Sequence, residues 1–215
     1  MRDEIIDYIQ RNRVTTTEIA DCMGKTGAVA DIGPINRGHF CVGPVRWTCA
    51  YEESNWRVHK DLINTKKGEI IFIDSFRCNG RSIIGELVSK YVLLYCQAEA
   101  IVSNAPMRDA AAIIRENYPV WSKGVSPVGC FNCRKEVDDG QDEILRAKKF
   151  YDGAIAVCDD CGVVVIPKEL HTEEFLAKIK EMENQEDIWF DCLDRKHENT
   201  FDIVCEKKYL KETKG

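Results

Sequence analysis

Apolar side chains near the start of the chain recur at the spacing of an amphipathic helix. Ile5, Ile6 and Ile9 fall on one face of residues 3–13, and the positions between them are mostly polar. Three threonines at 15–17 are N-cap candidates for a second helix, because their hydroxyls can accept from the backbone N–H groups of a first turn. The pattern therefore predicts two short helices at the start of the fold.

Beyond residue 28, short apolar runs bounded by turn residues alternate with segments of helical spacing. Such runs are typical of buried strands, and the glycines and prolines between them mark loops. The expected elements are a loop and strand over 28–50, a helix over 55–64, a strand over 70–74, a helix over 82–98, a strand over 100–103, a helix over 108–117 and an edge strand over 120–125. This alternation indicates an α/β fold in which helices flank a largely parallel sheet.

The pattern changes after Pro127. Residues 134–149 are strongly charged, which is typical of helix or loop, and residues 153–167 form two apolar runs around a polar centre. Two such runs joined by a few turn residues predict a β-hairpin, whose tight turn we expect at Asp159 and Asp160.

The C-terminal part of the chain has one clear helical pattern, over residues 171–184. The tail, residues 188–215, alternates only weakly, which is compatible with added strands or with packing on a neighbouring subunit. A chain of 215 residues is long enough for one substantial core. We therefore expect a single α/β domain over residues 1–187 and a C-terminal extension over 188–215.

The composition is that of an ordinary globular protein, with 44% hydrophobic and 31% charged residues. No stretch approaches the roughly 18 to 20 apolar residues that span a bilayer, and the N-terminus resembles a polar helix start rather than a signal peptide. We therefore expect a cytoplasmic protein without a membrane partner. The formal net charge of -6, with dispersed basic residues, disfavours a nucleic-acid partner.

Eleven cysteines without a secretory signal favour free thiols or metal ligands over a disulfide framework. Cys130 and Cys133 form one CxxC pair, and Cys158 and Cys161 form a second. Two such turns are typical of a structural zinc site, because each can present two thiolates to one tetrahedral ion. Buried or incidental thiols are the alternative, and the spacing alone leaves both open.

Two loop-to-helix junctions that follow predicted strands contain candidate catalytic residues. The first, residues 80–88, has glycines that let the backbone approach a ligand, and the second, residues 103–109, ends in Arg108 and Asp109. Helix N-termini at the carboxyl ends of parallel strands present unpaired N–H groups to ligands. An arginine can bind a carboxylate through two parallel hydrogen bonds, and an aspartate can hold a hard cation. An ordinary helix start with an acidic first turn is the alternative interpretation.

The segment IIGELVSKYVLLYCQAEAIVSNAPMRDAAAIIRENYPVWSKGVSP resembles the signature of the RraA-like family. That family includes 4-hydroxy-4-methyl-2-oxoglutarate/4-carboxy-4-hydroxy-2-oxoadipate aldolases and regulators of ribonuclease E activity. Four further segments resemble other parts of that family. TTTEIADCMG resembles its N-terminal helix, and VGPVRWTCAYEESNWRVHKDL resembles its first strand with the following helix. KKGEIIFIDS resembles its strand before the pocket, and GAIAVCDDCGVVVIPKE resembles its C-terminal hairpin. The resemblance covers about residues 14–170 and is most specific at the GEL and RD motifs. The family builds the hairpin without cysteine, which counts against the zinc site.

The resemblance implies a swivelling β/β/α domain that assembles as a trimer or as a pair of trimers, with active sites at subunit interfaces. In the aldolase members, the arginine at the position of Arg108 binds the pyruvyl carboxylate. The adjoining aspartate, here Asp109, holds Mg²⁺, with Mn²⁺ as the alternative, through its water shell. Glu86 would lie beside the metal waters, and the backbone N–H groups of Leu87 and Val88 would help to hold the carboxylate.

These parts imply a metal-dependent class II aldolase or decarboxylase. Its substrates would be small 2-keto acids such as 4-hydroxy-4-methyl-2-oxoglutarate or oxaloacetate, and it would release pyruvate. A divalent cation chelated by the keto acid would stabilise the enolate where its charge develops. Arg108 would orient the substrate, and Glu86 is the candidate base, acting through a metal-bound water. A helix-start glutamate without catalytic duty is the alternative for Glu86.

The presence of Asp109 favours an enzyme over a ribonuclease regulator, because family members that lack this aspartate are poor candidates for metal-assisted cleavage. The alternative function is a non-catalytic regulatory or protein-interaction module on the same scaffold. SNAPMRD replaces a more usual glycine-rich approach to the arginine, and WSKG replaces a smaller and more neutral strand. The substrate therefore need not be one of those named for the family.

Overall fold

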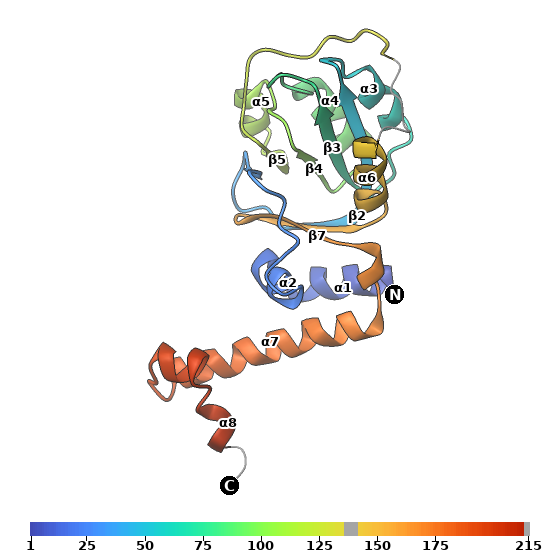
Figure 1. Cartoon of the computed structure of the whole chain (residues 1–215). Helices are drawn as coiled ribbons and strands as arrows, with labels where there is room; N and C mark the ends of the chain where they lie inside the picture. Colours follow the sequence, from blue (N-terminus) through green and yellow to red (C-terminus); the bar gives the residue numbers. More distant parts are fainter. Residues whose placement is uncertain (136–141, 213–215) are drawn as a thin grey trace. The chain divides into compact units, whose positions relative to one another are not determined.

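The described residues of the first part of the chain form one mixed sheet of seven strands (Figure 1). The computed structural model describes residues 1–135 and 142–212. The strand order is β1-β5-β4-β3-β2-β6-β7. The strands are β1 (Gly33–Pro34), β2 (Cys41–Tyr51), β3 (Ile70–Phe76), β4 (Ala100–Ser103), β5 (Val120–Ser122), β6 (Ile155–Asp159) and β7 (Gly162–Ile166).

The four central strands, β5, β4, β3 and β2, are parallel, whereas β1 and the β6–β7 hairpin pair antiparallel at the two ends of the sheet. The predicted α/β class is confirmed, and the parallel pairing is limited to this central part. β5 was expected at an edge, but it lies inside the sheet because the two-residue β1 pairs with its outer side. A two-residue strand has no periodicity that the sequence could reveal.

Helices cover both faces of this sheet. The helices of the first part are α1 (Arg2–Asn12), α2 (Thr16–Cys22), α3 (Trp56–Leu62), α4 (Glu86–Lys90), the π-helical η1 (Tyr91–Tyr95), α5 (Ala110–Arg115), α6 (Asp142–Tyr151) and the short 3-10 helix η2 (Lys168–Leu170). Helices α1 and α2 lie against β2 and the hairpin (Figure 1). The start of α2 is confirmed by a capping box, in which Thr15 and Glu18 each bind the other's backbone N–H.

Alternate residues of the parallel strands point to opposite faces of the sheet and form two buried clusters. On one face, Phe72 and Val102 pack with Ile144 of α6 and with the hairpin. On the other face, Ile71 and Ile101 pack with residues of α3, η1 and α5. Strands buried on both faces read as continuous apolar runs, which is why these strands were predictable from the sequence.

The helix expected over 82–98 begins only at Glu86 and continues as η1 to Tyr95. Before it, Ser82 forms an isolated parallel bridge with Gly129, because its backbone N–H and C=O are bonded to the segment that follows β5. Those backbone groups are therefore not available for a helix. The helix expected over 108–117 likewise begins later than expected, as α5.

The predicted hairpin is confirmed, but its turn lies at Asp160 and Cys161, one residue later than expected. Asp159 still belongs to β6, where it pairs with Gly162. The carboxylate of Asp159 accepts from the backbone N–H of Cys161 and from both the N–H and the hydroxyl of Thr16. This aspartate therefore fixes the hairpin tip to the first residue of α2.

The chain forms two compact units, Met1–Thr172 and Glu173–Gly215, so the first unit ends before the boundary expected at residue 187. In the second unit the described residues form α7 (Glu173–Asp194), the π-helical η3 (Phe201–Cys205) and α8 (Tyr209–Glu212). The helix expected over 171–184 is confirmed as the first part of α7. Up to residue 212 the tail has no strand, because Cys192 of α7 packs with Ile203 and Tyr209 in a helical cluster.

Part of the charged segment 134–149, namely residues 136–141, lies outside the described residues, and α6 begins at Asp142. Among the residues that the structure does describe, no helix has both the length and the apolar character that crossing a membrane requires.

Candidate active site

The two loop-to-helix junctions predicted from the sequence meet in the structure. β3 and β4 are neighbouring parallel strands, so the loops that follow them lie at the same edge of the sheet. The backbone N–H of Arg108 donates to the carbonyl of Ile84 at 3.1 Å. The backbone N–H of Glu86 donates to Oδ2 of Asp109, also at 3.1 Å. The start of α5 is therefore held against the start of α4.

Two glycines make room for this arrangement. A Cβ at Gly85 would overlap Oδ2 of Asp109 and would lie 2.7 Å from Cγ of Arg108. A Cβ at Gly129 would lie 2.7 Å from Nη1 of Arg108. Asp109 itself adopts a left-handed conformation, with φ 58° and ψ 36°, which costs a residue with a side chain about 1 to 2 kcal/mol. Strain of this kind is often found at functional sites.

A cleft of about 110 Å³ opens beside Arg108 and Asp109. It adjoins an apolar hollow of about 280 Å³, and the two share His59, Leu87 and Val88. The other residues that line the cleft are Asn55, Ser82, Ile83, Ile84, Gly85, Cys130 and Asn132. The cleft therefore has a charged end, at the start of α5, and an apolar side that continues along α4.

Arg108 and Asp109 are both half-exposed, with 52% and 45% of their side-chain surface open to solvent. Nε of Arg108 lies 3.6 Å from Oδ2 of Asp109, so the positive and negative groups are side by side at one end of the cleft. Burial and the positive charge of Arg108 lower the pKa of His59 below its ordinary value of 6.5. His59 is therefore a neutral imidazole at neutral pH.

Of the predicted site residues, the structure brings Arg108, Asp109, Leu87 and Val88 to one cleft. Glu86 is not among the described residues that line it. Its Oε1 lies 3.4 Å from Nη2 of Arg115 on α5, and the part of Glu86 that contacts Asp109 is its backbone N–H. The predicted position of Glu86 beside the site is therefore supported by its backbone, whereas its carboxylate is paired with an arginine.

Asn55 and His59 are among the residues that line the cleft but were missed from the sequence. Asn55 precedes α3 and His59 lies one helical turn further on, so that both belong to one face of this helix. Asn55 is only 6% exposed, and its Nδ2 donates to the carbonyl of Ile83 at 2.7 Å. Its Oδ1 has no hydrogen-bond partner among the described residues. An asparagine and a histidine separated by four positions could have served as a weak signal.

The side chains at this site fit a hard divalent cation that keeps most of its water. The described residues contain no group of three or more His, Cys, Asp or Glu side chains that could hold a metal ion. Asp109 would therefore be the main protein ligand. Mg²⁺ is commonly bound in this way, through one or two carboxylates, with water and substrate oxygens completing its octahedron.

The four cysteines of the predicted zinc site do not converge. Cys158 is fully buried on β6 in the same cluster as Phe72. Cys130 packs against the cluster on the other face of the sheet, whereas Cys133 and Cys161 are exposed. Because the sheet separates Cys158 from Cys130, no four-thiolate site is assembled within the part of the chain that the structure describes.

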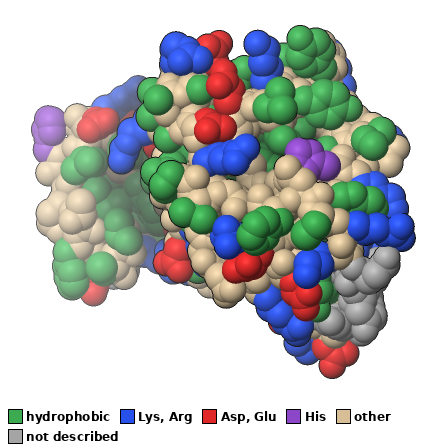
Figure 2. All heavy atoms as spheres, turned by 90° about the horizontal axis from the view of Figure 1, so that it is seen from above, with side chains coloured by type: hydrophobic (Ala, Val, Ile, Leu, Met, Phe, Trp, Pro, Cys, Tyr) green, Lys and Arg blue, Asp and Glu red, His purple; other side chains and the backbone are tan. Residues whose placement is uncertain are grey.

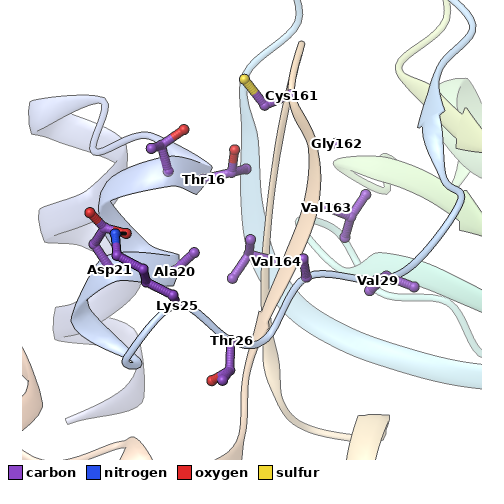
Figure 3. A pocket seen from close by; sticks show the side chains of 12 residues that line it. Thr16, Ala20, Asp21, Lys25, Thr26, Val29, Cys161, Gly162, Val163 and Val164 are labelled. Atoms are coloured by element: carbon purple, nitrogen blue, oxygen red, sulfur yellow. Dashed lines mark hydrogen bonds and ion pairs between the residues drawn. The ribbon is translucent and has the colours of Figure 1, made fainter.

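A larger hollow, of about 310 Å³, lies between α2 and β7 (Figure 3). On one side of it, Lys25 and Asp21 form an ion pair at 2.7 Å, and Val163 and Val164 lie on the other side (Figure 3). Its acidic and basic groups are thus already paired with each other. The smaller cleft beside Arg108 is the better candidate for an active site, because charged side chains and a neutral histidine line it together.

The face of the molecule seen from above is mixed in character. In Figure 2, basic and acidic side chains are interleaved, and hydrophobic side chains gather in small patches between them. This view shows no continuous basic stripe of the kind that binds a nucleic-acid backbone.

The RraA-like family model, described as Aldolase/RraA, matches residues 16–165. A Halalkalibacterium halodurans protein named "Putative 4-hydroxy-4-methyl-2-oxoglutarate aldolase" is 30% identical over 182 residues, which are 81% of this chain and 83% of that protein.

Two solved structures, each less than 25% identical and so informative on the fold alone, agree with this match. An uncharacterized protein of Pseudomonas syringae is 20% identical, with a TM-score of 0.68 over 89% of each chain. A Streptomyces coelicolor member of the RNase ES inhibitor RraA protein family is 18% identical, with a TM-score of 0.64 over 86% of this chain and 92% of that one. Because the family model matches well over half of its residues, this chain belongs to the RraA-like family.

Proposed function

We propose that this chain is a metal-dependent class II lyase that cleaves a carbon–carbon bond in small 2-keto acids and releases pyruvate. Candidate substrates are 4-hydroxy-4-methyl-2-oxoglutarate and oxaloacetate. The observation that carries the proposal is the placement of Arg108 and Asp109 at one end of a cleft, against the first turn of α4. The name of the Halalkalibacterium halodurans relative supports the same reaction class.

The carboxylate of the substrate binds at the Arg108 end of the cleft. A guanidinium can hold a carboxylate through two parallel hydrogen bonds, which fixes its orientation as well as its position. The backbone N–H groups of Leu87 and Val88 belong to the first turn of α4, where N–H groups have no partner within the helix. Both residues line the cleft, so these N–H groups can donate to the second oxygen of the carboxylate.

Asp109 holds the divalent cation, for which Mg²⁺ is the first candidate and Mn²⁺ the second. A cation held there would supply Lewis-acid stabilisation of the negative charge that develops on the keto oxygen. The chain orients the Asp109 carboxylate through the backbone N–H of Glu86. Gly85 allows this approach, since any Cβ there would displace the carboxylate.

Proton transfer requires an unprotonated base near the substrate. Glu86, the candidate from the family resemblance, pairs with Arg115 and does not line the cleft in the described structure. His59 lines it, and its lowered pKa keeps the imidazole in the form that accepts a proton. We therefore assign the base to His59 and leave Glu86 as a residue that positions Asp109.

The cleft adjoins an exposed apolar surface, which we propose is covered by a second copy of the chain in a trimer or a pair of trimers. Leu87 on α4 is 81% exposed and Tyr95 on η1 is 74% exposed, with Tyr91 and Leu94 between them. An apolar patch of this kind commonly marks an interface. Analytical ultracentrifugation tests this assembly, and a monomer at micromolar concentration contradicts it.

The function is tested by incubating the purified protein with a panel of keto acids, with and without Mg²⁺, and measuring pyruvate. We expect metal-dependent release from at least one keto acid and its loss in Arg108→Ala and Asp109→Ala. Arg11→Ala and Asp7→Ala are matched controls, because this exposed arginine and aspartate form an ion pair on α1. Absence of pyruvate from every keto acid refutes the proposal and favours the non-catalytic regulatory module.

A further inference from the structure

Two cysteines that are far apart in the sequence lie together beside the cleft. Cys78 follows β3 in a turn, and Cys130 belongs to the segment that follows β5. The thiol of Cys78 donates to the carbonyl of Phe76 at 3.4 Å and lies close enough to the thiol of Cys130 for each to shift the pKa of the other. Cys78 is 5% exposed and is part of the buried cluster against which Cys130 packs. The sequence spacing paired Cys130 with Cys133, whereas the fold pairs it with Cys78.

The backbone holds these two segments in a fixed register. The N–H of Arg81 donates to the carbonyl of Cys78 at 2.9 Å, which closes the turn. The guanidinium of Arg81 donates to the carbonyl of Gly129 at 3.0 Å, and the N–H of Cys130 donates to the carbonyl of Ser82 at 3.0 Å. These hydrogen bonds therefore fix the two segments that carry the cysteines side by side.

We propose that Cys78 and Cys130 form a reversible disulfide, which makes this pair a site of oxidative modification that acts on the neighbouring cleft. The oxidant is a peroxide, which accepts two electrons. The Cys78 thiol loses its proton, the thiolate attacks one peroxide oxygen and the O–O bond breaks, which leaves a sulfenic acid and a hydroxide that takes up the released proton to form water. The Cys130 sulfur then attacks the Cys78 sulfur and loses its proton, and the S–O bond breaks to release a second water.

The surroundings give the two thiols different roles. The contact with Cys130 lowers the pKa of the Cys78 thiol, whereas the same contact and burial raise the pKa of Cys130. The thiolate is the nucleophilic form of cysteine, so Cys78 is the attacking residue and Cys130 the resolving one. Cys130 is also the more exposed of the two, and a reductant would reach the disulfide from its side.

A second pair, Cys41 and Cys158, lies directly opposite across β2 and β6 and provides an internal comparison. Burial raises the pKa of both of these thiols, and neither of them lines the cleft. Because neither forms a thiolate readily, this pair should stay reduced under the conditions that oxidise the first pair.

Closing the disulfide would disturb Arg108. The bond requires a sulfur–sulfur distance of about 2.05 Å, which is shorter than any contact between two thiols. The two sulfurs must therefore approach each other, through rotation of the side chains and movement of the segments that carry them. Gly129 belongs to the segment of Cys130 and lies against the guanidinium of Arg108, since a Cβ at Gly129 would lie 2.7 Å from Nη1 of Arg108. A displacement of about 1 Å at a substrate-binding group can lower turnover roughly 100-fold.

The disulfide is tested by treating the full chain with hydrogen peroxide, blocking the remaining thiols and mapping the unreduced peptides by mass spectrometry. We expect a cross-linked peptide that joins Cys78 to Cys130 and disappears with dithiothreitol. Cys78→Ser and Cys130→Ser should not form it, whereas Cys133→Ser and Cys41→Ser should form it as the wild type does. Absence of this cross-link, or a cross-link between Cys41 and Cys158 in its place, overturns the proposal.

The effect on the cleft rests on the proposed function and is measured separately, as metal-dependent pyruvate release before oxidation, after it and after reduction. We expect a loss of about tenfold or more that dithiothreitol restores, and no such loss in Cys78→Ser relative to its own untreated rate. A complete cross-link with unchanged turnover refutes the effect on the cleft. Because the peptide map needs no turnover, a reduced wild type without activity counts against the proposed function alone.

Discussion

The backbone N–H of Glu86 donates to Oδ2 of Asp109 at 3.1 Å. This bond joins the first residue of α4 to the residue that precedes α5, and so it links the loops that follow two neighbouring parallel strands. It fixes where the proposed metal-binding carboxylate points. Most of the behaviour that we expect of the site follows from how closely these two loops approach each other.

Gly85 permits that approach, so replacing it should damage the site more than the fold. In Gly85→Ala, the new Cβ would overlap Oδ2 of Asp109 and displace the carboxylate. We expect metal-dependent pyruvate release to fall roughly 100-fold, measured beside the urea unfolding midpoint. Gly33→Ala is the control, because a Cβ at Gly33 meets nothing within 4 Å. Equal rates in the two variants would show that the approach at Gly85 is not required.

His59 should make the reaction rate fall at acid pH, which gives the pH–rate profile an acid limb. Burial and the nearby Arg108 lower its pKa below 6.5, so the imidazole is neutral above that lowered value and becomes protonated as the pH falls through it. A protonated imidazole cannot accept a proton, and the rate of the wild type should therefore decline at acid pH. In His59→Gln the rate should be low and should lack this limb. If Glu86→Gln removes the limb instead, the base is Glu86.

Asp74 should make the stability of the fold depend on pH. Burial raises its pKa to about 6, although Trp47 and Asn104 both donate to its carboxylate. The folded state thus binds the proton more tightly than the unfolded state. The stabilising contribution is full below the ordinary value of 3.8 and is lost as the pH rises through about 6.

We expect the wild type to lose roughly 2 to 3 kcal/mol of unfolding free energy between about pH 4 and pH 7 that Asp74→Asn does not lose. Urea unfolding of both proteins across this range measures the difference. Parallel pH curves for the two proteins would show that Asp74 does not titrate in the folded state as expected.

Metal removal should stop turnover without unfolding the protein. The described residues contain no cluster of His, Cys, Asp or Glu side chains that could hold a structural metal, and Cys158 and Cys130, one from each CxxC pair, lie on different faces of the sheet. Protein purified without added metal should therefore contain no stoichiometric zinc, and a chelator should leave the thermal unfolding midpoint unchanged. About one zinc per chain, lost in Cys133→Ser or Cys161→Ser, would show instead that the zinc site suggested by the sequence exists.

Much of the fold could be predicted because its strands are short apolar runs between turn residues. Residues 70–74 and 100–103 were identified in this way, as was the hairpin. Arg108 and Asp109 were recognisable because they are adjacent in the sequence and follow a strand. Local patterns suffice where the relevant neighbours are close along the chain.

The missed features depend on contacts between distant segments. The bridge between Ser82 and Gly129 delays the start of α4, and no local pattern signals it. His59 reaches the cleft from α3, which precedes β3 in the chain. The CxxC spacing favoured pairs of nearby cysteines, whereas the fold places Cys130 beside Cys78. Tertiary contacts of this kind override local preference.

The central claim is that Arg108 and Asp109 jointly hold a keto acid and a divalent cation. Isothermal titration calorimetry with oxalate, a stable mimic of the pyruvate enolate, measures this without requiring turnover. We predict that oxalate binds the wild type only when Mg²⁺ is present. Asp109→Ala should abolish this metal dependence, and Arg108→Ala should weaken binding about 10- to 100-fold, as expected for the loss of a charged hydrogen bond. Oxalate binding that is equally tight without Mg²⁺, or unchanged in both variants, would contradict the account.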